Sequence, residues 1–328
     1  MTTVDSSCRL LAGQYVGKQV KGLARQLEAI RTAGDPEHVH QARVALRRLQ
    51  VALRMFRGCF PRKKPKVWRK AIRRLLKALS PVRDRDVQVG HVRDLVARMD
   101  GGGQRPGLAR LALRLEQQRE ALQADVVEAV EQFEDSLVLD QMRITAGRVV
   151  AGEKDADPRS PVVFHEVRRE MGRRLEKVLA LQDCLDHPDD KERCHAMRVE
   201  AKRLRYALEI CRGLYDGALK EFVGAVKELQ RLLGDLHDCD MWIDRLQEFL
   251  AEERSRTVGY FGHARSCRRI EVGIRWFLDH QQARRTDLFM RLTDCWRQAE
   301  QGRLWTRFTE TLDARAGPSA LPPKPSAP

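Results

Sequence analysis

Apolar residues recur at spacings of three and four along most of the chain, and the alternation typical of β-strands is hard to find. Leu, Ala, Arg, Glu and Gln, which favour helices, are abundant. We therefore expect an all-α protein. The predicted helices cover residues 8–32, 37–59, 66–80, 84–99, 107–135, 137–150, 162–184, 190–214, 217–233, 238–256, 261–281 and 286–312.

Glycine and proline mark the breaks between these helices. Asp35 stands between Gly34 and Pro36, where it is expected to cap the N-terminus of the next helix. The segment 101–107 is a predicted loop, 151–161 a predicted linker, and the Pro-rich end a predicted disordered tail. The expected division is a lead (1–8), two repeats (9–150 and 162–312) and the tail (313–328).

An internal repeat is the most informative feature of the sequence. The segment HQARVALRRLQVALRMFRGCF from His40 matches HAMRVEAKRLRYALEICRGLY from His195 without a gap. A second match follows, between residues 70–87 and 224–241. The sequence thus predicts two related helical bundles from a duplication, packed about a pseudo-twofold axis.

Each repeat places cations along one face of its first matched helix. Apolar residues, including Leu46, Leu49, Leu204 and Leu208, fall on the opposite face and form the expected core. From His40 to Arg54 the cationic stripe spans roughly 21 Å, at a rise of about 1.5 Å per residue, which suits an extended ligand. The stripes comprise His40, Arg43, Arg47 and Arg54 in the first repeat, and His195, Arg198, Lys202 and Arg205 in the second.

Apolar strips, such as Val51 and Met55 in the first repeat and Tyr206 and Ile210 in the second, border these stripes. Packing on both sides predicts a groove between helices. A second basic row follows on the next helix, with Arg69, Arg73 and Lys77 in the first repeat and Lys227 and Arg231 in the second. Clustered like charges destabilise a fold unless an anion binds them, so a polyanion site is expected.

Two matched carboxylate pairs lie at the end of the second match, Asp84 with Asp86 and Asp238 with Asp240. We interpret them as N-terminal carboxylates of the helices that begin there, favoured by the helix dipole, or as partners that orient the cations.

Charge and cysteine content support the same class of protein. The chain has 328 residues and a formal net charge of +15, which attracts polyanions. None of the eight cysteines forms a C-x-x-C pair, which predicts buried thiols in a reducing compartment. With no apolar segment resembling a secretion signal or a membrane span, a cytoplasmic protein is expected.

The motifs His40-x-x-Arg43-Val44-x-x-Arg47-Arg48-Leu49 and His195-x-x-Arg198-Val199-x-x-Lys202-Arg203-Leu204-Arg205-Tyr206 resemble those of the CHAD family, the conserved histidine α-helical domain. The elements Arg83-Asp84-x-Asp86 and Leu236-His237-Asp238-x-Asp240 extend the resemblance. It implies a basic central groove between two bundles that binds inorganic polyphosphate. Arg48, Arg203, Tyr206 and His237 join the residues above as expected ligands, while Gln50-Val51 departs from Arg205-Tyr206. We expect a non-enzymatic binding protein without a cofactor, recruited to polyphosphate or storage granules.

Three other functions were weighed. Glu37-x-x-His40 and Glu192-x-x-His195 have the spacing of di-iron bundles, but the cations on the histidine face would repel a metal. His237-Asp238 resembles a phosphohydrolase dyad, yet further histidine ligands are missing from the sequence. Nucleic-acid binding is the main alternative, although few aromatic residues accompany the basic stripes and base-stacking platforms are lacking.

Overall fold

The helices of the computed structural model confirm the all-α prediction. The structure describes residues 5–32, 35–99 and 102–317, and no strand occurs in these ranges. The α-helices are α1 (Ser6–Thr32), α2 (Pro36–Met55), α3 (Lys64–Ala97), α4 (Arg105–Ala121), α5 (Gln123–Asp135), α6 (Val138–Gly152), α7 (Pro161–Leu179), α8 (Lys191–Cys211), α9 (Lys220–Phe261), α10 (Arg268–Gln301) and α11 (Leu304–Ala316). Short 3-10 helices are η1 (Gln182–Asp186), η2 (Arg212–Leu214) and η3 (Arg265–Cys267).

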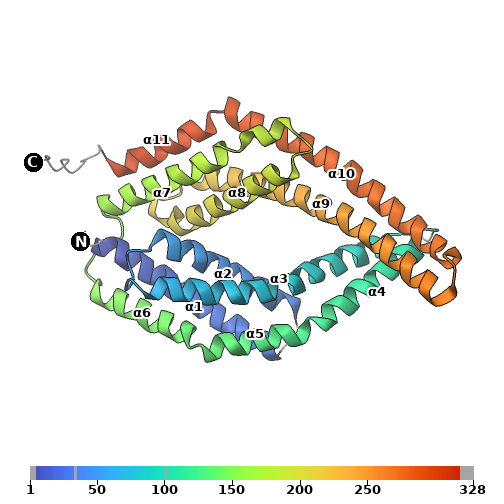
Figure 1. Ribbon diagram of the computed structural model, residues 1–328. Helices are drawn as coiled ribbons and strands as arrows, with labels where there is room; N and C mark the ends of the chain where they lie inside the picture. Colours follow the sequence, from blue (N-terminus) through green and yellow to red (C-terminus); the bar gives the residue numbers. More distant parts are fainter. Residues whose placement is uncertain (1–4, 33–34, 100–101, 318–328) are drawn as a thin grey trace, which may run out of the picture.

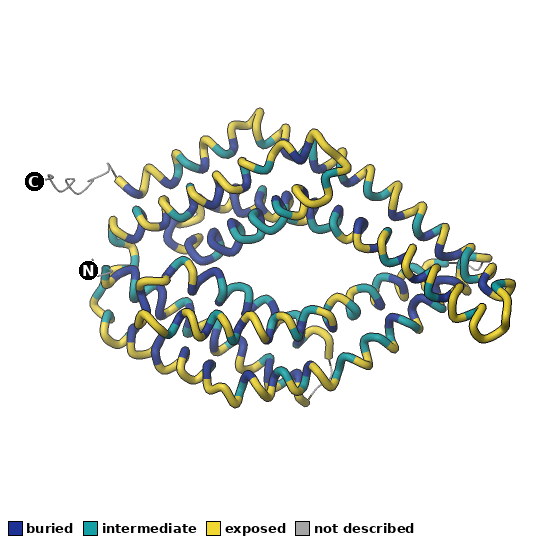
Figure 2. The backbone as a smooth tube through the Cα atoms, in the orientation of Figure 1, coloured by how far each residue is buried: buried dark blue, intermediate teal, exposed yellow. Residues whose placement is uncertain are grey.

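The helices form two layers that meet at both ends of an elongated molecule (Figure 1). One layer contains α1 to α6 and the other α7 to α11. At one end α2 packs on α8 and α1 on α7, and at the other end α4 packs on α10. Between these ends α2 and α3 face α8 and α9, with residues of intermediate exposure along the facing sides (Figure 2).

Two hydrophobic clusters hold these ends together. The larger one runs through both layers, from Leu23 and Leu46 to Leu208 and Phe308. The smaller one joins α3, α4, α9 and α10 at the far end, where Phe249 and Phe277 are fully buried. Removal of this apolar surface from water stabilises the packing of the two layers at both ends.

Helices α3 and α9 are longer than predicted. The sequence suggested separate helices over 66–80 and 84–99, and over 217–233 and 238–256, but each pair is continuous in the structure. Buried positions continue at helical spacing through Pro81, from Leu79 to Val82. Their packing outweighs the hydrogen bond that Pro81 cannot donate. Asp84 and Asp238 consequently lie inside helices, and their interpretation as helix-start carboxylates is wrong.

Other boundaries also differ. The segment predicted as one helix over 107–135 divides into α4 and α5 at Leu122, and the two predicted over 261–281 and 286–312 form α10 and α11 with different limits. Residues 313–316, assigned to the tail, complete α11, whereas the tail from 318 onward lies outside the described residues. The linker prediction agrees with the gap between α6 and α7. Asp35 caps α2 by accepting from the Glu37 backbone N–H at 2.8 Å.

Close contact between α4 and α10 requires two glycines. A Cβ on Gly107 would lie 2.4 Å from the Ile270 carbonyl oxygen, and one on Gly273 only 2.0 Å from that of Gln104. These distances are below any tolerable contact, so the two backbones pack directly. The packing of α4 on α10, which we call the far-end closure, therefore requires glycine at these two positions as well as buried apolar side chains.

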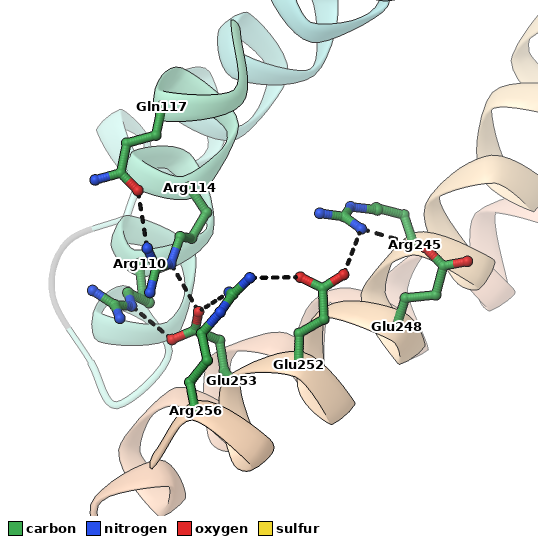
Figure 3. Close-up of polar contacts among 8 residues, drawn as sticks. All are labelled: Arg110, Arg114, Gln117, Arg245, Glu248, Glu252, Glu253 and Arg256. Carbon is green, nitrogen blue, oxygen red and sulfur yellow. Dashed lines mark hydrogen bonds and ion pairs between the residues drawn. The ribbon is translucent and has the colours of Figure 1, made fainter. Parts of the chain in front are cut away.

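A buried carboxylate adds an ionic contact to this closure (Figure 3). Glu253 of α9 is 1% exposed and accepts from Arg110 Nε at 2.8 Å and Arg114 Nε at 2.9 Å, both on α4. Arg256 Nη1 donates to the same carboxylate at 2.8 Å. Burial alone would raise the pKa of Glu253, but the hydrogen bonds from the three arginines lower it below its ordinary value. The carboxylate is thus held in its charged form.

The cysteines are mostly core residues, as predicted. All eight are free, and each is buried except Cys295, which is partly exposed.

Candidate functional site

The cationic stripe of α2 arises from its amphipathic sequence. Leu46, Leu49 and Leu53 are fully buried and fix the orientation of the helix. His40 and Arg47, on the opposite face, are half-buried. The sequence-based division of this helix into an apolar and a cationic side is confirmed.

Arg43 is held in place by α3. Its side chain is buried, and Nη1 donates to the Ser80 carbonyl at 2.9 Å and to Asp84 Oδ1 at 3.3 Å. Asp84 is therefore a partner that orients the stripe, the second interpretation given to it above. Most of the hydrogen-bonding capacity of Arg43 is therefore used within the fold. Arg43 adds positive charge to the site from this fixed position.

The stripes of α2 and α8 meet at Lys202. Burial and then the charges of Arg198, Arg47, Arg205 and Arg43 together lower the pKa of this lysine from 10.5 to about 7. Because Arg47 and Arg43 belong to α2 and the others to α8, cations from both layers repel one another here. An anion between them would remove that repulsion.

Arg198 lies at the centre of this group. Its Nε is buried and has no hydrogen-bond acceptor among the described residues. Burial lowers the pKa of Arg198, the carboxylates of Asp238 and Asp84 oppose this shift, and Arg47 adds to it. The Asp238 side chain reaches solvent, yet burial raises its pKa.

Two histidines from different helices lie at one end of the group. The Nδ1 atoms of His195 on α8 and His237 on α9 are 3.4 Å apart, with ring centroids at 4.7 Å. Burial, followed by the charge of Arg198, lowers the pKa of His237 to about 4. The pKa of His195 is lowered by burial and then by Arg198 and Lys202. The pKa of His40 is likewise lowered, by burial and by Arg83.

A second gathering of arginines surrounds Arg54 at the other end of the stripe. Burial and then the charge of Arg203 lower the pKa of Arg54, followed by the charges of Arg69, Arg174 and Arg73. These side chains come from α2, α3, α7 and α8. The basic row on α3 and the stripes on α2 and α8 thus converge.

The family model described as CHAD domain matches residues 14–247, most of the chain. The chain belongs to the CHAD family. The solved CHAD domain from the plant Ricinus communis has the same fold, with a TM-score of 0.63 and 24% identity over 88% of this chain and 90% of that chain. No curated protein matches the sequence.

Membership of the CHAD family is consistent with polyphosphate binding in general. Within the ranges that the structure describes, no group of three or more His, Cys, Asp and Glu side chains is arranged to hold a metal ion. No helix among those described is long and apolar enough to cross a bilayer.

Several expected ligands of the CHAD motif already have carboxylate partners. Arg48 Nη2 on α2 contacts Glu209 of α8 at 3.1 Å, and Arg205 contacts the same carboxylate at 3.6 Å. Arg203 pairs with Glu200 on its own helix. Glu209 therefore joins the two layers beside the site. Tyr206 is buried, with the Arg205 guanidinium 4.8 Å from its ring centroid, so it packs behind the cations.

The other members of the predicted basic row are exposed or paired with carboxylates. Lys77 and Lys227 are exposed. Arg231 pairs with Glu228 at 2.6 Å and Asp235 at 2.8 Å, and its charge acts on Cys295 of α10. Arg231 is therefore already paired with two carboxylates of its own helix.

Four further cations of this CHAD domain were missed by the sequence reasoning. Arg83 acts on His40, Arg174 acts on Arg54, and the charge of Arg245 on α9 lowers the pKa of Arg85 on α3 after burial. Arg83 and Arg85 were visible as neighbours of Asp84. Arg174 lies outside the repeated motifs, and only the packing of α7 brings it beside Arg54. Arg245 also lies outside them and is paired with Glu248 and Glu252.

The local charge balance favours an anionic ligand. Among the described residues, no ion pair involves Arg47, Arg54, Arg198 or Lys202 within 4.0 Å. Guanidinium and ammonium groups in this setting can each bind phosphoryl or other acidic oxygens. The arrangement can bind an extended polyanion at several points.

Proposed function

We propose that this CHAD protein binds inorganic polyphosphate in a basic groove between α2 and α8. One observation carries the proposal. Arg47 from one layer acts directly on Lys202 and Arg198 from the other, and none of the three has an ion-pair partner among the described residues. A chain of phosphoryl groups would supply the missing negative charge along the whole stripe.

The length of the cationic surface favours a linear polymer. The unpaired cations extend along α2 from Arg47 to Arg54, where Arg69 and Arg73 of α3 add further charge. Compact anions could bind at one point of this surface but would leave the rest uncompensated. Polyphosphate carries a charge on every repeat, and arginine side chains grip such oxygens in pairs.

The protein is proposed to act by binding alone, without catalysis or a cofactor. The cations that dominate the site stabilise a bound anion, and the nearby histidines have pKa values lowered by burial. A cytoplasmic role in recruitment to polyphosphate or storage granules fits a module that recognises the polymer itself.

Nucleic acid is the second candidate because its backbone offers similar charges. Polyphosphate is favoured since Tyr206, the aromatic residue within the stripe, is buried behind Arg205 and offers no stacking platform for a base.

The proposal is tested by titrating the protein with long-chain polyphosphate, single-stranded RNA and DNA at two salt concentrations. We expect the tightest binding for polyphosphate. Its affinity should fall steeply as the salt concentration rises, because binding releases the counterions held around the polymer. Equal affinities for the three polymers would contradict it and indicate a general polyanion binder.

A further inference from the structure

The last turn of α9 exposes apolar and aromatic side chains far from the proposed groove. Val258 is 43%, Tyr260 83% and Phe261 56% exposed. They lie at the far end of the molecule, where the last turn of α9 projects beyond the packed core (Figure 1). The buried residues of α9 end at Glu253, so the helix continues past the last position that the fold requires. We call residues 254–270 the tip.

The tip is also strongly basic. It contains five arginines and no Asp or Glu. Arg256 is engaged by Glu252 and Glu253. The others are exposed and form no ion pair with any residue that the structure describes: Arg254, Arg265, Arg268 and Arg269. The tip thus carries both unpaired guanidinium groups and exposed apolar side chains, so a partner must offer both negative charge and a place for apolar groups.

Ring geometry distinguishes between possible partners. Phe261 has Tyr260 edge-on against it, with centroids 4.7 Å apart and planes at 79°. The ring of His263 lies nearly parallel to Phe261, at 15° and 6.4 Å. The rings of Tyr260 and His263 thus pack against Phe261 and reduce the ring face that it offers to a nucleic-acid base, whereas stacking on the exposed Tyr260 is decided by the oligouridine measurement below. Val258 adds aliphatic surface, which favours insertion into an apolar medium.

We propose that the tip binds the surface of an anionic lipid membrane. Val258, Tyr260 and Phe261 enter the interfacial layer, and the four unpaired arginines contact the lipid headgroups. Aromatic residues prefer this boundary, and basic residues close to it are attracted by anionic lipids. The end of α9 projects at one end of the molecule (Figure 1), where it can meet a planar surface. Pairing with a second copy is disfavoured, since two such tips would repel each other.

This inference does not depend on the proposed groove, and the experiment separates the two. Co-sedimentation is measured with vesicles of phosphatidylcholine alone and with vesicles that also contain phosphatidylglycerol. The variants are Tyr260→Ser with Phe261→Ser, and Arg265→Ser with Arg268→Ser and Arg269→Ser. A matched control is Met290→Ser with Val67→Ser, because both side chains are exposed elsewhere, at 55% and 54%.

We expect the wild type to bind the anionic vesicles about tenfold or more tightly than the neutral ones, and both tip variants to lose at least about tenfold. The control should bind like the wild type. All the substituted side chains are solvent-exposed, so thermal unfolding should be unchanged, and polyphosphate affinity should stay within about twofold for the aromatic variant.

Two results would overturn the inference. In the first, the tip variants bind anionic vesicles as well as the wild type does. In the second, the aromatic variant loses affinity for a single-stranded oligouridine and keeps its affinity for vesicles, which would identify the tip as an RNA-binding surface.

Discussion

The Nδ1 atoms of His195 and His237 lie 3.4 Å apart and connect α8 with α9 beside Arg198. Two charged imidazoles at this distance would repel each other, and the pKa of His237 is about 4. The pair is therefore neutral near pH 7 and can gain a proton when an anion binds next to it.

Acidification should consequently strengthen polyphosphate binding through His237. An anion raises the pKa of His237 in the complex above about 4, so affinity increases as pH falls through the bound-state pKa. Fluorescence polarisation at constant ionic strength, from pH 7 to 5, should show a smaller increase for His237→Gln than for the wild type. Identical pH profiles would exclude the pair from the site.

Lys202 should produce a second pH dependence above neutrality. Since its pKa is about 7, the free protein carries the charge below pH 7 and loses it as pH rises. Binding favours the charged form, so affinity should decline from pH 7 towards 9. The Lys202→Arg variant keeps its charge, so its loss of affinity between pH 7 and 9 should be smaller than that of the wild type by about fivefold or more. An unchanged slope in the variant would contradict the assignment.

The same lysine should destabilise the unliganded fold. The pKa of Lys202 is ordinarily 10.5 and is about 7 in the folded protein. Between pH 7 and 10.5 the unfolded chain therefore binds more protons than the folded chain. Stability should thus rise as pH increases through this window. Lys202→Met is expected to raise the Tm at pH 7 while it weakens polyphosphate binding. Calorimetry with and without the polymer measures both effects, and a lower Tm would count against repulsion at this site.

Removal of the Asp84 charge should strengthen anion binding. Asp84 contacts Arg43 at 3.3 Å and partly offsets the positive potential that Arg198 also experiences. Asp84→Asn should raise polyphosphate affinity several-fold. Because the carboxylate is 62% exposed, the loss of its ion pair should change the free energy of unfolding by less than about 1 kcal/mol. Weaker binding would mean that orientation of Arg43 matters more than charge.

Glu253→Gln should open the far-end closure. Three arginines surround this buried carboxylate, and the loss of its charge leaves them uncompensated, at a cost of about 3 kcal/mol. Denaturant unfolding should reveal the loss, and hydrogen exchange should rise in α4 and the end of α9. Glu248→Gln is the control, because Glu248 is 65% exposed and pairs with Arg245 alone. Equal effects of the two changes would contradict this role.

The composition and periodicity of the chain were enough to predict its helices and the face of α2 that carries cations. Helix continuity through Pro81 could not be predicted, because burial of Leu79 and Val82 by other elements decides it. That continuity also changed the role of Asp84 from a helix start to a partner of Arg43.

For the site, the spacing of Arg43, Arg47, Arg198 and Lys202 predicted one cationic face on each helix. It did not reveal that Glu209 would neutralise Arg48, because that contact crosses 161 residues of sequence. The contribution of Arg174 comes from α7, a helix with no matching motif, so only the fold could disclose it.

The most direct test compares Arg47→Gln/Arg198→Gln/Lys202→Gln with Lys18→Gln/Arg25→Gln/Arg148→Gln in a polyphosphate titration. The control residues are exposed on α1 and α6, and at pH 6, where Lys202 is charged, the net charge changes about equally in both triple variants. We expect the first variant to lose at least about 100-fold in affinity and the control less than about threefold, with helicity unchanged in both. Equal losses would contradict a groove between α2 and α8 and leave net charge as the cause of binding.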